Sequence, residues 1–290
     1  MSDVRELSAI ALPAAHLRLN IRPAAIVAGA TLIVFIYSLP YIYLLLTSFK
    51  PANDVLQIPP SFFPARVSIE NYAAVLANPS IPAAFGNSLL VAVGSTVLSL
   101  LLAVPAAYGA SFFRTRLSGW FLLFALVTRM VPSVSLGLPL FSLMRTLGLL
   151  DTPLALILAH TTISLPLAIW MLAAFFESVP SELEEAARID GCSRFGALVR
   201  VILPVVTGGI AITALFAFIA SWNEFLYALL LTAQRATTAP IMISQFKTAY
   251  GLSWGPMTAI AVLYSAPVIL VSLVLQKQIV GGLTFGAVKG

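Results

Sequence analysis

Residues 177–204 read ESVPSELEEAARIDGCSRFGALVRVILP and form a long polar interruption in a chain that is otherwise apolar. The stretch holds five of the eleven acidic residues of the chain, together with three arginines. Charged side chains are costly to place in lipid. We therefore predict a loop that faces water between two apolar segments, and the rest of the fold is organised around this loop.

The sequence of the loop predicts two short helices joined by a sharp turn. Ser181 and Glu184 have the spacing of a capping box, in which the two side chains bind free backbone N–H groups at the start of a helix. Gly191 can adopt the left-handed conformation that ends a helix, and Ser193 can cap a second helix just beyond it. The first helix is thus expected to begin at Ser181 and to end before Gly191.

Each of these helices has a face suited to packing. On the first helix, the residues that share one side are mostly small, which suits insertion into a groove. They are Leu183, Ala186, Ala187 and Asp190. The second helix carries an apolar stripe that can lie against membrane-spanning helices. It consists of Phe195, Leu198, Val199 and Ile202.

The composition of the chain predicts an all-α, polytopic membrane protein. Hydrophobic residues make up 60% of the chain and charged residues 9%, whereas about a quarter of a soluble domain is charged. Six apolar runs each exceed the roughly 20 residues that cross a bilayer. They cover residues 24–49, 85–113, 119–143, 153–176, 203–231 and 256–279. The polar loop lies between the fourth and fifth predicted transmembrane helices.

The distribution of basic residues predicts the orientation of the six helices. With the N-terminus in the cytoplasm, ten Lys and Arg residues fall in cytoplasmic segments and five in external ones, as the positive-inside rule requires. We therefore expect an N-in/C-in topology with the polar loop in the cytoplasm. The domain organisation is then a cytoplasmic N-terminal segment (1–23), a transmembrane domain (24–280) that includes the loop (177–204), and a cytoplasmic tail (281–290).

The sequence offers no catalytic, metal-binding or cofactor-binding pattern. With His16, His160 and Cys192 as the histidines and cysteine of the chain, no metal-ligand cluster is expected. We interpret His160 as a packing histidine and Cys192 as a small filler. No glycine-rich loop followed by Lys and Ser or Thr is present, so any ATP must be bound elsewhere. Dispersed basic residues also argue against a nucleic-acid partner.

Two charged residues lie within the apolar runs, Arg129 and Glu224. An intramembrane charge is a functional hypothesis, because its burial is costly. At 1.5 Å per residue, Arg129 lies roughly 15 Å into the third run and Glu224 about 30 Å along the fifth, so we do not expect them to pair. Trp222 and Asn223 precede Glu224 and offer the aromatic face and hydrogen-bonding groups that sugars use. These four residues are candidates for a translocation pathway, with an interfacial belt as the alternative for Trp222.

The polar loop resembles the EAA motif of ABC importer permeases. The matching residues are an EAA triplet, a glycine four residues beyond it, and a hydrophobic-x-Leu-Pro ending: Glu185, Ala186, Ala187, Gly191, Val201, Leu203 and Pro204. The resemblance implies that the loop is a coupling helix seated in a cytoplasmic ATPase. The resemblance implies that the contacts with the ATPase are made by Glu184, Glu185, Ala186, Ala187, Asp190, Gly191, Leu203 and Pro204.

Further pieces resemble the sugar-importer, maltose-type (MalG-like) branch of these permeases. They are Glu70-Asn71-Tyr72, Asn87-Ser88, Arg129-Met130 with Pro132, Trp222-Asn223-Glu224-Phe225 and the glycine-rich ending 282–290. This branch implies a non-catalytic subunit in the inner (cytoplasmic) membrane of a prokaryote. It also implies a second homologous (MalF-like) permease, a cytoplasmic ATPase dimer that uses ATP and Mg²⁺, and an external solute-binding protein that delivers an oligosaccharide or disaccharide.

Three alternatives remain open at this point. The coupling motif does not encode the substrate, so an importer of glycerol-3-phosphate, amino acids or another small polar solute is the runner-up within the family. An ion-coupled secondary transporter would normally show internal repeats or intramembrane carboxylates, of which Glu224 is the single candidate. A membrane scaffold without transport activity is the third alternative, and stimulation of an ATPase by an external binding protein would argue against it.

Overall fold

The computed structural model describes residues 23–51, 54–113, 115–245, 247–248, 251–252 and 254–285. The N-terminal segment up to residue 22 and the last five residues of the predicted tail lie outside the described residues. The chain divides into two compact units, one ending at Leu44 and the other beginning at Leu45. Most of α1 (Pro23–Ser48) belongs to the first unit, and the remaining elements belong to the second.

Among the described residues, four helices are long and apolar enough to cross a membrane without a break. They are α1, α3 (Ser80–Phe112), α6 (Pro153–Glu177) and α13 (Trp254–Phe285). These helices match the first, second, fourth and sixth apolar runs. The all-helical prediction is confirmed in outline, with a two-stranded ribbon, β1 (Lys247–Thr248) and β2 (Gly251–Leu252), as a small addition.

The sequence predicted one span for the third apolar run, but this run is not one continuous helix. It consists of α4 (Arg116–Thr128) and α5 (Ser133–Thr146), which meet at an angle of 92°. Pro132 stands directly before α5, where it lacks a backbone N–H and disfavours helical geometry in the preceding residue. Apolar composition alone does not reveal such a break, because it records length and not direction.

The fifth run is likewise broken. After α8 (Arg194–Ala197), a π-helical turn (198–202) and α9 (Leu203–Val205), the chain bends by 82° into α10 (Thr207–Trp222). Gly208 and Gly209 follow the bend, and both are weak helix formers. A second interruption separates α10 from α11 (Leu226–Leu231). Counting each bent pair as one span, up to six spans are present in the described chain.

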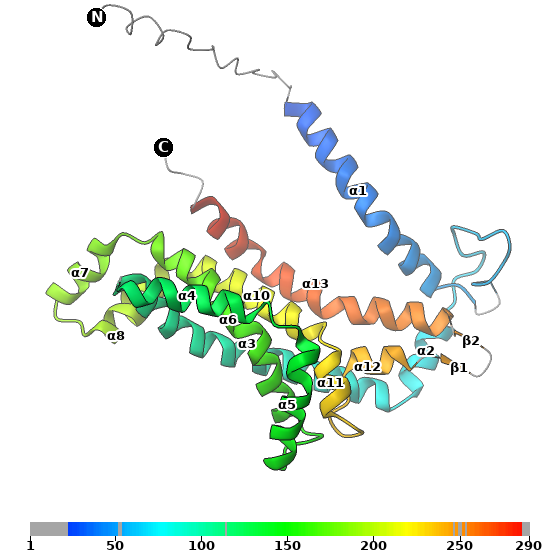
Figure 1. The fold of residues 1–290 in the computed structure, drawn as a ribbon. Coiled ribbons are helices and arrows are strands. Elements are labelled where there is room, and N and C mark those ends of the chain that lie inside the picture. Colours follow the sequence, from blue (N-terminus) through cyan, green and yellow to red (C-terminus); the bar gives the residue numbers. More distant parts are fainter. Residues whose placement is uncertain are drawn as a thin grey trace, which may run out of the picture. The chain divides into compact units, whose positions relative to one another are not determined.

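The core of the second unit is built by α3, α6 and α10, with α13 packed along α10 (Figure 1). Alanines at the contacts between α3 and α6 allow the two backbones to approach closely. They are Ala103, Ala107, Ala168 and Ala173. One apolar cluster lies beside the polar loop, and a second lies near α11 and the start of α6. Figure 1 shows α7 (Ser181–Ile189) and α8 at one end of these helices, with α11 and α12 (Ala239–Ser244) toward the other.

Asp151 ties two connections together at the end opposite α7. Its carboxylate accepts hydrogen bonds from the backbone N–H groups of residues 233–236, at 3.0–3.2 Å. Partial burial opposes ionisation of this carboxyl, but the backbone donors outweigh it and lower the pKa of Asp151 to about 2. The loop after α11 is therefore anchored to the start of α6. The short helix α2 (Glu70–Ala77) lies beyond α1 in the chain.

Candidate coupling loop and pathway residues

The first helix of the polar loop, α7, begins at Ser181 as predicted, but the capping box does not form. No side chain caps its first turn. Glu184 is instead buried, and its Oε1 accepts a hydrogen bond of 3.1 Å from the hydroxyl of Tyr108 on α3. A buried phenol requires a partner, and the carboxylate serves that need in preference to the free N–H groups at the helix start, which lie near water.

The end of α7 confirms the prediction for Gly191. Its φ is +89°, in the left-handed region. Gly191 N–H donates to Arg188 O at 3.1 Å, and Cys192 N–H donates to Ala187 O at 3.0 Å. These two bonds define a Schellman motif, which closes the last turn of the helix. The predicted second cap is also present, because Ser193 Oγ accepts from the Gly196 N–H at 3.1 Å.

The face that α7 buries within the chain includes only one residue of the predicted small-residue face, Ala187. Glu184 and Ala187 are buried, whereas the other members of the predicted face are exposed. The exposed side, called here the α7 outer face, consists of Leu183, Glu185, Ala186, Ile189 and Asp190. The hydrogen bond from Tyr108 holds Glu184 against α3, and most of the face predicted to suit insertion into a groove stays exposed. The α7 outer face mixes apolar and acidic side chains.

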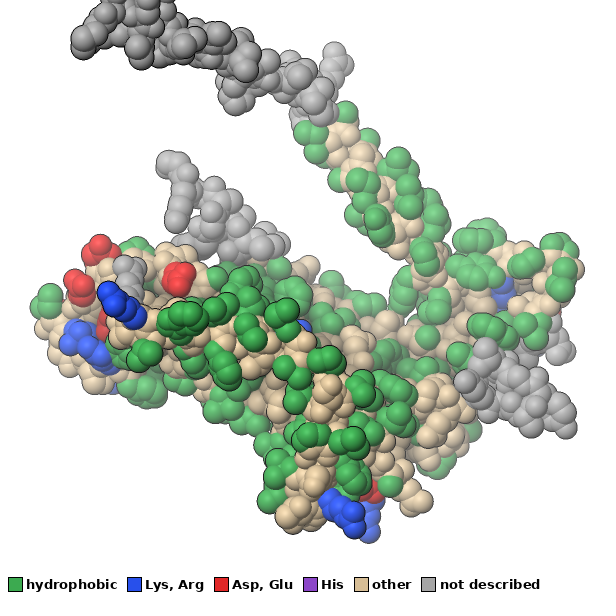
Figure 2. Space-filling view, in the orientation of Figure 1, with side chains coloured by type: hydrophobic (Ala, Val, Ile, Leu, Met, Phe, Trp, Pro, Cys, Tyr) green, Lys and Arg blue, Asp and Glu red, His purple; other side chains and the backbone are tan. Residues whose placement is uncertain are grey.

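The second helix also buries less than predicted. Leu198 and Ile202 pack into the apolar cluster beside the loop, but Phe195 is 74% exposed and Val199 is exposed as well. The Arg194 guanidinium lies 4.5 Å from the centre of the Phe113 ring, a cation–π contact that holds the start of this helix against the end of α3. Acidic and basic side chains gather at this end of the molecule (Figure 2).

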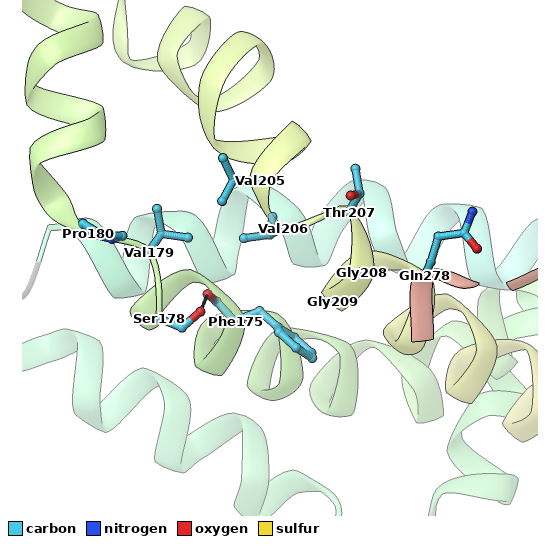
Figure 3. A pocket seen from close by; sticks show the side chains of 10 residues that line it. All are labelled: Phe175, Ser178, Val179, Pro180, Val205, Val206, Thr207, Gly208, Gly209 and Gln278. Carbon is cyan, nitrogen blue, oxygen red and sulfur yellow. Dashed lines mark hydrogen bonds between the residues drawn. The ribbon is translucent and has the colours of Figure 1, made fainter. Parts of the chain in front are cut away.

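The loop leaves through Leu203 and Pro204 into the bend before α10. Leu203 packs against the apolar cluster, and Pro204 follows the π-helical turn near the end of the continuous helical segment 194–205. Beside the bend lies a cavity of about 210 Å³, drawn in Figure 3. On one of its walls, a Cβ at Gly209 would lie 2.3 Å from Cγ of Phe175, so glycine lets α10 begin directly against α6.

Of the four candidate pathway residues, Arg129 and Asn223 are exposed, and the side chains of Trp222 and Glu224 are buried. Arg129 is exposed at the break between α4 and α5, and its Nη1 donates to Ile163 O at 3.0 Å. Asn223 is exposed after α10. Trp222 is only 1% exposed and stacks on the ring of Tyr264 at 5.2 Å between centroids.

The side chain of Glu224 is 8% exposed and does not contact Arg129. It lies against His160, with Nε2 3.3 Å from Oε2. The expectation that Arg129 and Glu224 would not pair therefore agrees with the structure. His160 is buried and hydrogen-bonded to Ser221, which agrees with a packing histidine, and it also faces a buried carboxylate that the sequence did not indicate as its neighbour.

The comparison with known proteins decides the family. The model of the family described as "Binding-protein-dependent transport system inner membrane component" matches residues 95–283, which include α7 and Gly191. The chain belongs to this family. The permease is 36% identical to the trehalose/maltose transport system permease protein MalG of Thermococcus litoralis, over 91% of this chain and 96% of that one.

Two further comparisons agree with this assignment. The permease is 38% identical to the trehalose transport system permease protein SugB of Mycobacterium tuberculosis, over 90% and 95% of the two chains. It also resembles a chain in the crystal structure of a bacterial ABC transporter involved in the import of the acidic polysaccharide alginate. That likeness has a TM-score of 0.72 and 26% identity, and it covers 88% of this chain and 95% of that one.

The permease is thus an ABC importer subunit in the cytoplasmic membrane, with several membrane-crossing helices. Two contacts that involve the site residues were not predictable from sequence spacing. They join Tyr108 with Glu184 and His160 with Glu224. Their partners are 76 and 64 residues apart, so no local spacing relates them. The available signal was chemical, since a histidine and a carboxylate that both lie in apolar runs need partners.

Proposed function

We propose that this permease forms half of the translocation pore of an ATP-driven importer for a sugar, most simply a disaccharide or oligosaccharide, delivered by an external solute-binding protein. Family membership supports the transport role, and the relatives named for trehalose and maltose support a sugar as substrate. The observation that carries the proposal is the coupling loop. A short helix with a fixed end presents an exposed face of apolar and acidic side chains beside the core of α3 and α6.

The proposed topology has six spans, with both termini and the coupling loop in the cytoplasm. Two sets of contacts support an alternating arrangement. Near its C-terminal end, α3 reaches the coupling loop through Tyr108 and Glu184. At its other end, Asn87 donates to Arg235 O and Thr237 O, in the loop that Asp151 anchors to the start of α6. Hence α3 and α6 both point toward the coupling loop, and α10 returns from it.

The same arrangement defines the proposed domains. The transmembrane domain covers residues 24–280 with the coupling loop at 177–204. It is flanked by a cytoplasmic segment (1–23) and a cytoplasmic tail (281–290). The tail is proposed to lie near the ATPase, and its last five residues are outside the described part of the chain.

Three protein partners complete the proposed transporter. A cytoplasmic ATPase dimer binds ATP and Mg²⁺ and receives the α7 outer face. Glu185, Ala186 and Asp190 are available for direct contact on that face, while Glu184 and Ala187 hold the helix to its own chain. A second, homologous permease completes the pore. A solute-binding protein docks on the opposite side of the membrane.

Within the pore, we assign the pathway lining to the two exposed candidates, Arg129 and Asn223. An arginine exposed within a spanning segment is far less costly in a water-filled pathway than against lipid. Trp222 and Glu224, which are covered by α13 and α6, form the wall behind this lining. Tyr264 links the two layers, because its hydroxyl donates to Trp222 O at 2.7 Å and lies 3.2 Å from Asn223 Oδ1.

Reconstitution tests the proposed function. The permease is placed in proteoliposomes with its cognate partner permease, ATPase and binding protein, and uptake of labelled maltose, trehalose, glycerol-3-phosphate and amino acids is measured. We expect sugar uptake that requires ATP, and ATPase activity that rises with the sugar-loaded binding protein. Uptake driven by an ion gradient without ATP would refute the importer assignment. ATP-driven uptake of glycerol-3-phosphate or amino acids alone would refute the sugar assignment.

A further inference from the structure

Two ionisable side chains meet in the core of the permease, away from the coupling loop. His160 on α6 is 1% exposed, and the side chain of Glu224, between α10 and α11, is 8% exposed. Their Nε2 and Oε2 atoms are 3.3 Å apart. A buried carboxylate without a partner is strongly destabilising. The contact with His160 lies on one side of the Glu224 carboxylate, and backbone N–H groups satisfy the other side.

A chain of hydroxyl groups sets the orientation of the imidazole. Ser95 Oγ on α3 donates to Ser221 Oγ on α10 at 2.8 Å, and Ser221 Oγ lies 2.7 Å from His160 Nδ1. Since Ser221 accepts from Ser95, its own hydrogen is free to point at Nδ1. Nδ1 then acts as the acceptor, and Nε2 carries the hydrogen on the side of the ring where Glu224 Oε2 lies 3.3 Å away. The direction of the hydrogens is inferred from this order of donors and acceptors.

The far side of Glu224 holds the start of α11. Its carboxylate accepts from the Tyr227 N–H at 2.9 and 3.0 Å and from the Ala228 N–H at 3.2 Å. Charge-assisted bonds of this kind at a helix start are strong. With six residues, α11 is too short to be stable alone. Its position thus depends on packing and on Glu224.

We propose that His160 is a positioning residue, which holds Glu224 in the orientation that starts α11 and so sets the geometry of the pathway beside Asn223. The polar chain runs from α3 through α10 and α6 to α11, and α11 packs on α5, the helix that follows Arg129. Release of Glu224 would let α11 and α5 shift together. This inference rests on the proposed pathway for its link to transport, but its structural content can be tested without transport.

Thiol labelling tests the structural content directly. In a Cys192→Ser background, Ala228→Cys places a reporter on α11 and Ala103→Cys places one in the other apolar cluster. Both alanines are fully buried, at 0% exposure. Adding His160→Leu should raise the labelling rate at position 228 by about tenfold or more and leave position 103 unchanged. His160→Gln, which retains an N–H donor, should keep most of the protection at 228.

A matched control and an uptake assay complete the test. Ser164→Ala removes a buried hydroxyl that donates within α6 to His160 O, so it should change neither labelling nor uptake. His160→Leu should lower the maximal uptake rate more than it changes the apparent KM. Unchanged labelling at 228, or an equal rise at 103, would overturn the positioning role. Absence of ATP-dependent uptake by the unmodified complex would count against the proposed function, while the labelling result would stand on its own.

Discussion

At Gly191, the backbone conformation matters more than the space around it. A Cβ there would meet no atom within 4 Å, yet φ is +89°. We predict that Gly191→Val strains the turn by roughly 1–2 kcal/mol and re-aims α7, because the Schellman motif sets its end. The variant should reach the membrane in normal amounts, bind the ATPase more weakly and lose ATP-dependent uptake. Co-purification and uptake at equal expression measure both effects.

Two companion variants sharpen this prediction. Gly191→Asn should retain more activity than Gly191→Val, since asparagine tolerates the left-handed region. Glu185→Lys should resemble Gly191→Val, because it reverses the charge of the α7 outer face without touching the turn. Full uptake by Gly191→Val would show that the loop is an ordinary linker.

The hydroxyl of Tyr108 gives the second prediction. Tyr108→Phe leaves the buried carboxylate of Glu184 without its donor, which costs about 1–3 kcal/mol. We expect a lower melting temperature of the purified permease and weaker binding of the ATPase. Tyr72→Phe is the matched control, because that phenol lies 2.7 Å from Ser48 Oγ in a connection far along the chain from α7. Equal loss of ATPase binding in both variants would contradict a specific role for Tyr108.

These residues show what the sequence could reveal at the finest scale. The end of α7 at Gly191 and the cap at Ser193 were predicted, since each depends on neighbours within a few residues. The start at Ser181 was also predicted, although the capping box from which it was inferred does not form. The orientation of Glu184 was not, because local backbone donors compete with a phenol from another helix and the phenol wins on burial. The same reasoning applies to His160, whose partner is set by the packing of α6 against α10.

At the scale of elements, the crossing of α6 and α10 depends on one missing side chain. We predict that Gly209→Ala destabilises the permease by about 1–3 kcal/mol, since its Cβ would lie 2.3 Å from the Phe175 ring. Thermal unfolding in detergent measures the loss. The double variant Phe175→Ala with Gly209→Ala should be less impaired than the sum of the single changes. Strict additivity would show that the two residues do not meet.

The connection held by Asp151 should respond to acid. Its folded-state pKa of about 2 lies below the unfolded value, so the carboxylate adds stability at neutral pH that is lost as the pH falls from about 4 toward 2. Asp151→Asn should lower stability at pH 7 by no more than about 1 kcal/mol, since solvent screens this partly exposed group. It should also reduce the loss of stability below pH 4. Unfolding across this pH range, with Asp54→Asn as control, is the measurement. If Asp151→Asn left the loss of stability below pH 4 unchanged, the lowered pKa assigned to Asp151 would be contradicted.

Element positions were more predictable than element directions. Apolar length located the four unbroken candidate spans and the regions of the two bent pairs, because the bilayer sets a minimum run. The 92° and 82° bends were missed, although prolines and glycines mark both places. Pro132 and Pro139 lie in the same run, but only the break at 129–132 redirects the chain. Whether a proline kinks a helix or ends it depends on the neighbours that satisfy the freed carbonyls.

At the scale of the whole molecule, the topology is the main prediction. Reporter fusions after Arg114, Gly191 and Lys289 should be cytoplasmic, and fusions after Asn71 or Thr237 should be external. Arg114 and Lys289 lie outside the described residues, and their placement follows from the positive-inside rule. Paired alkaline phosphatase and fluorescent-protein fusions provide the readout. An external fusion at Gly191 would invalidate the coupling-loop assignment.

The Schellman turn has a practical consequence through Cys192, the single cysteine of the sequence. Its N–H is bonded to Ala187 O, so the Cα of this residue is locked to the last turn of α7. A dye attached to the natural thiol would therefore report the tilt of α7 rather than independent motion of a loop. Polarised emission from such a dye, recorded during ATP hydrolysis, would report the reorientation of α7 in real time without an engineered cysteine.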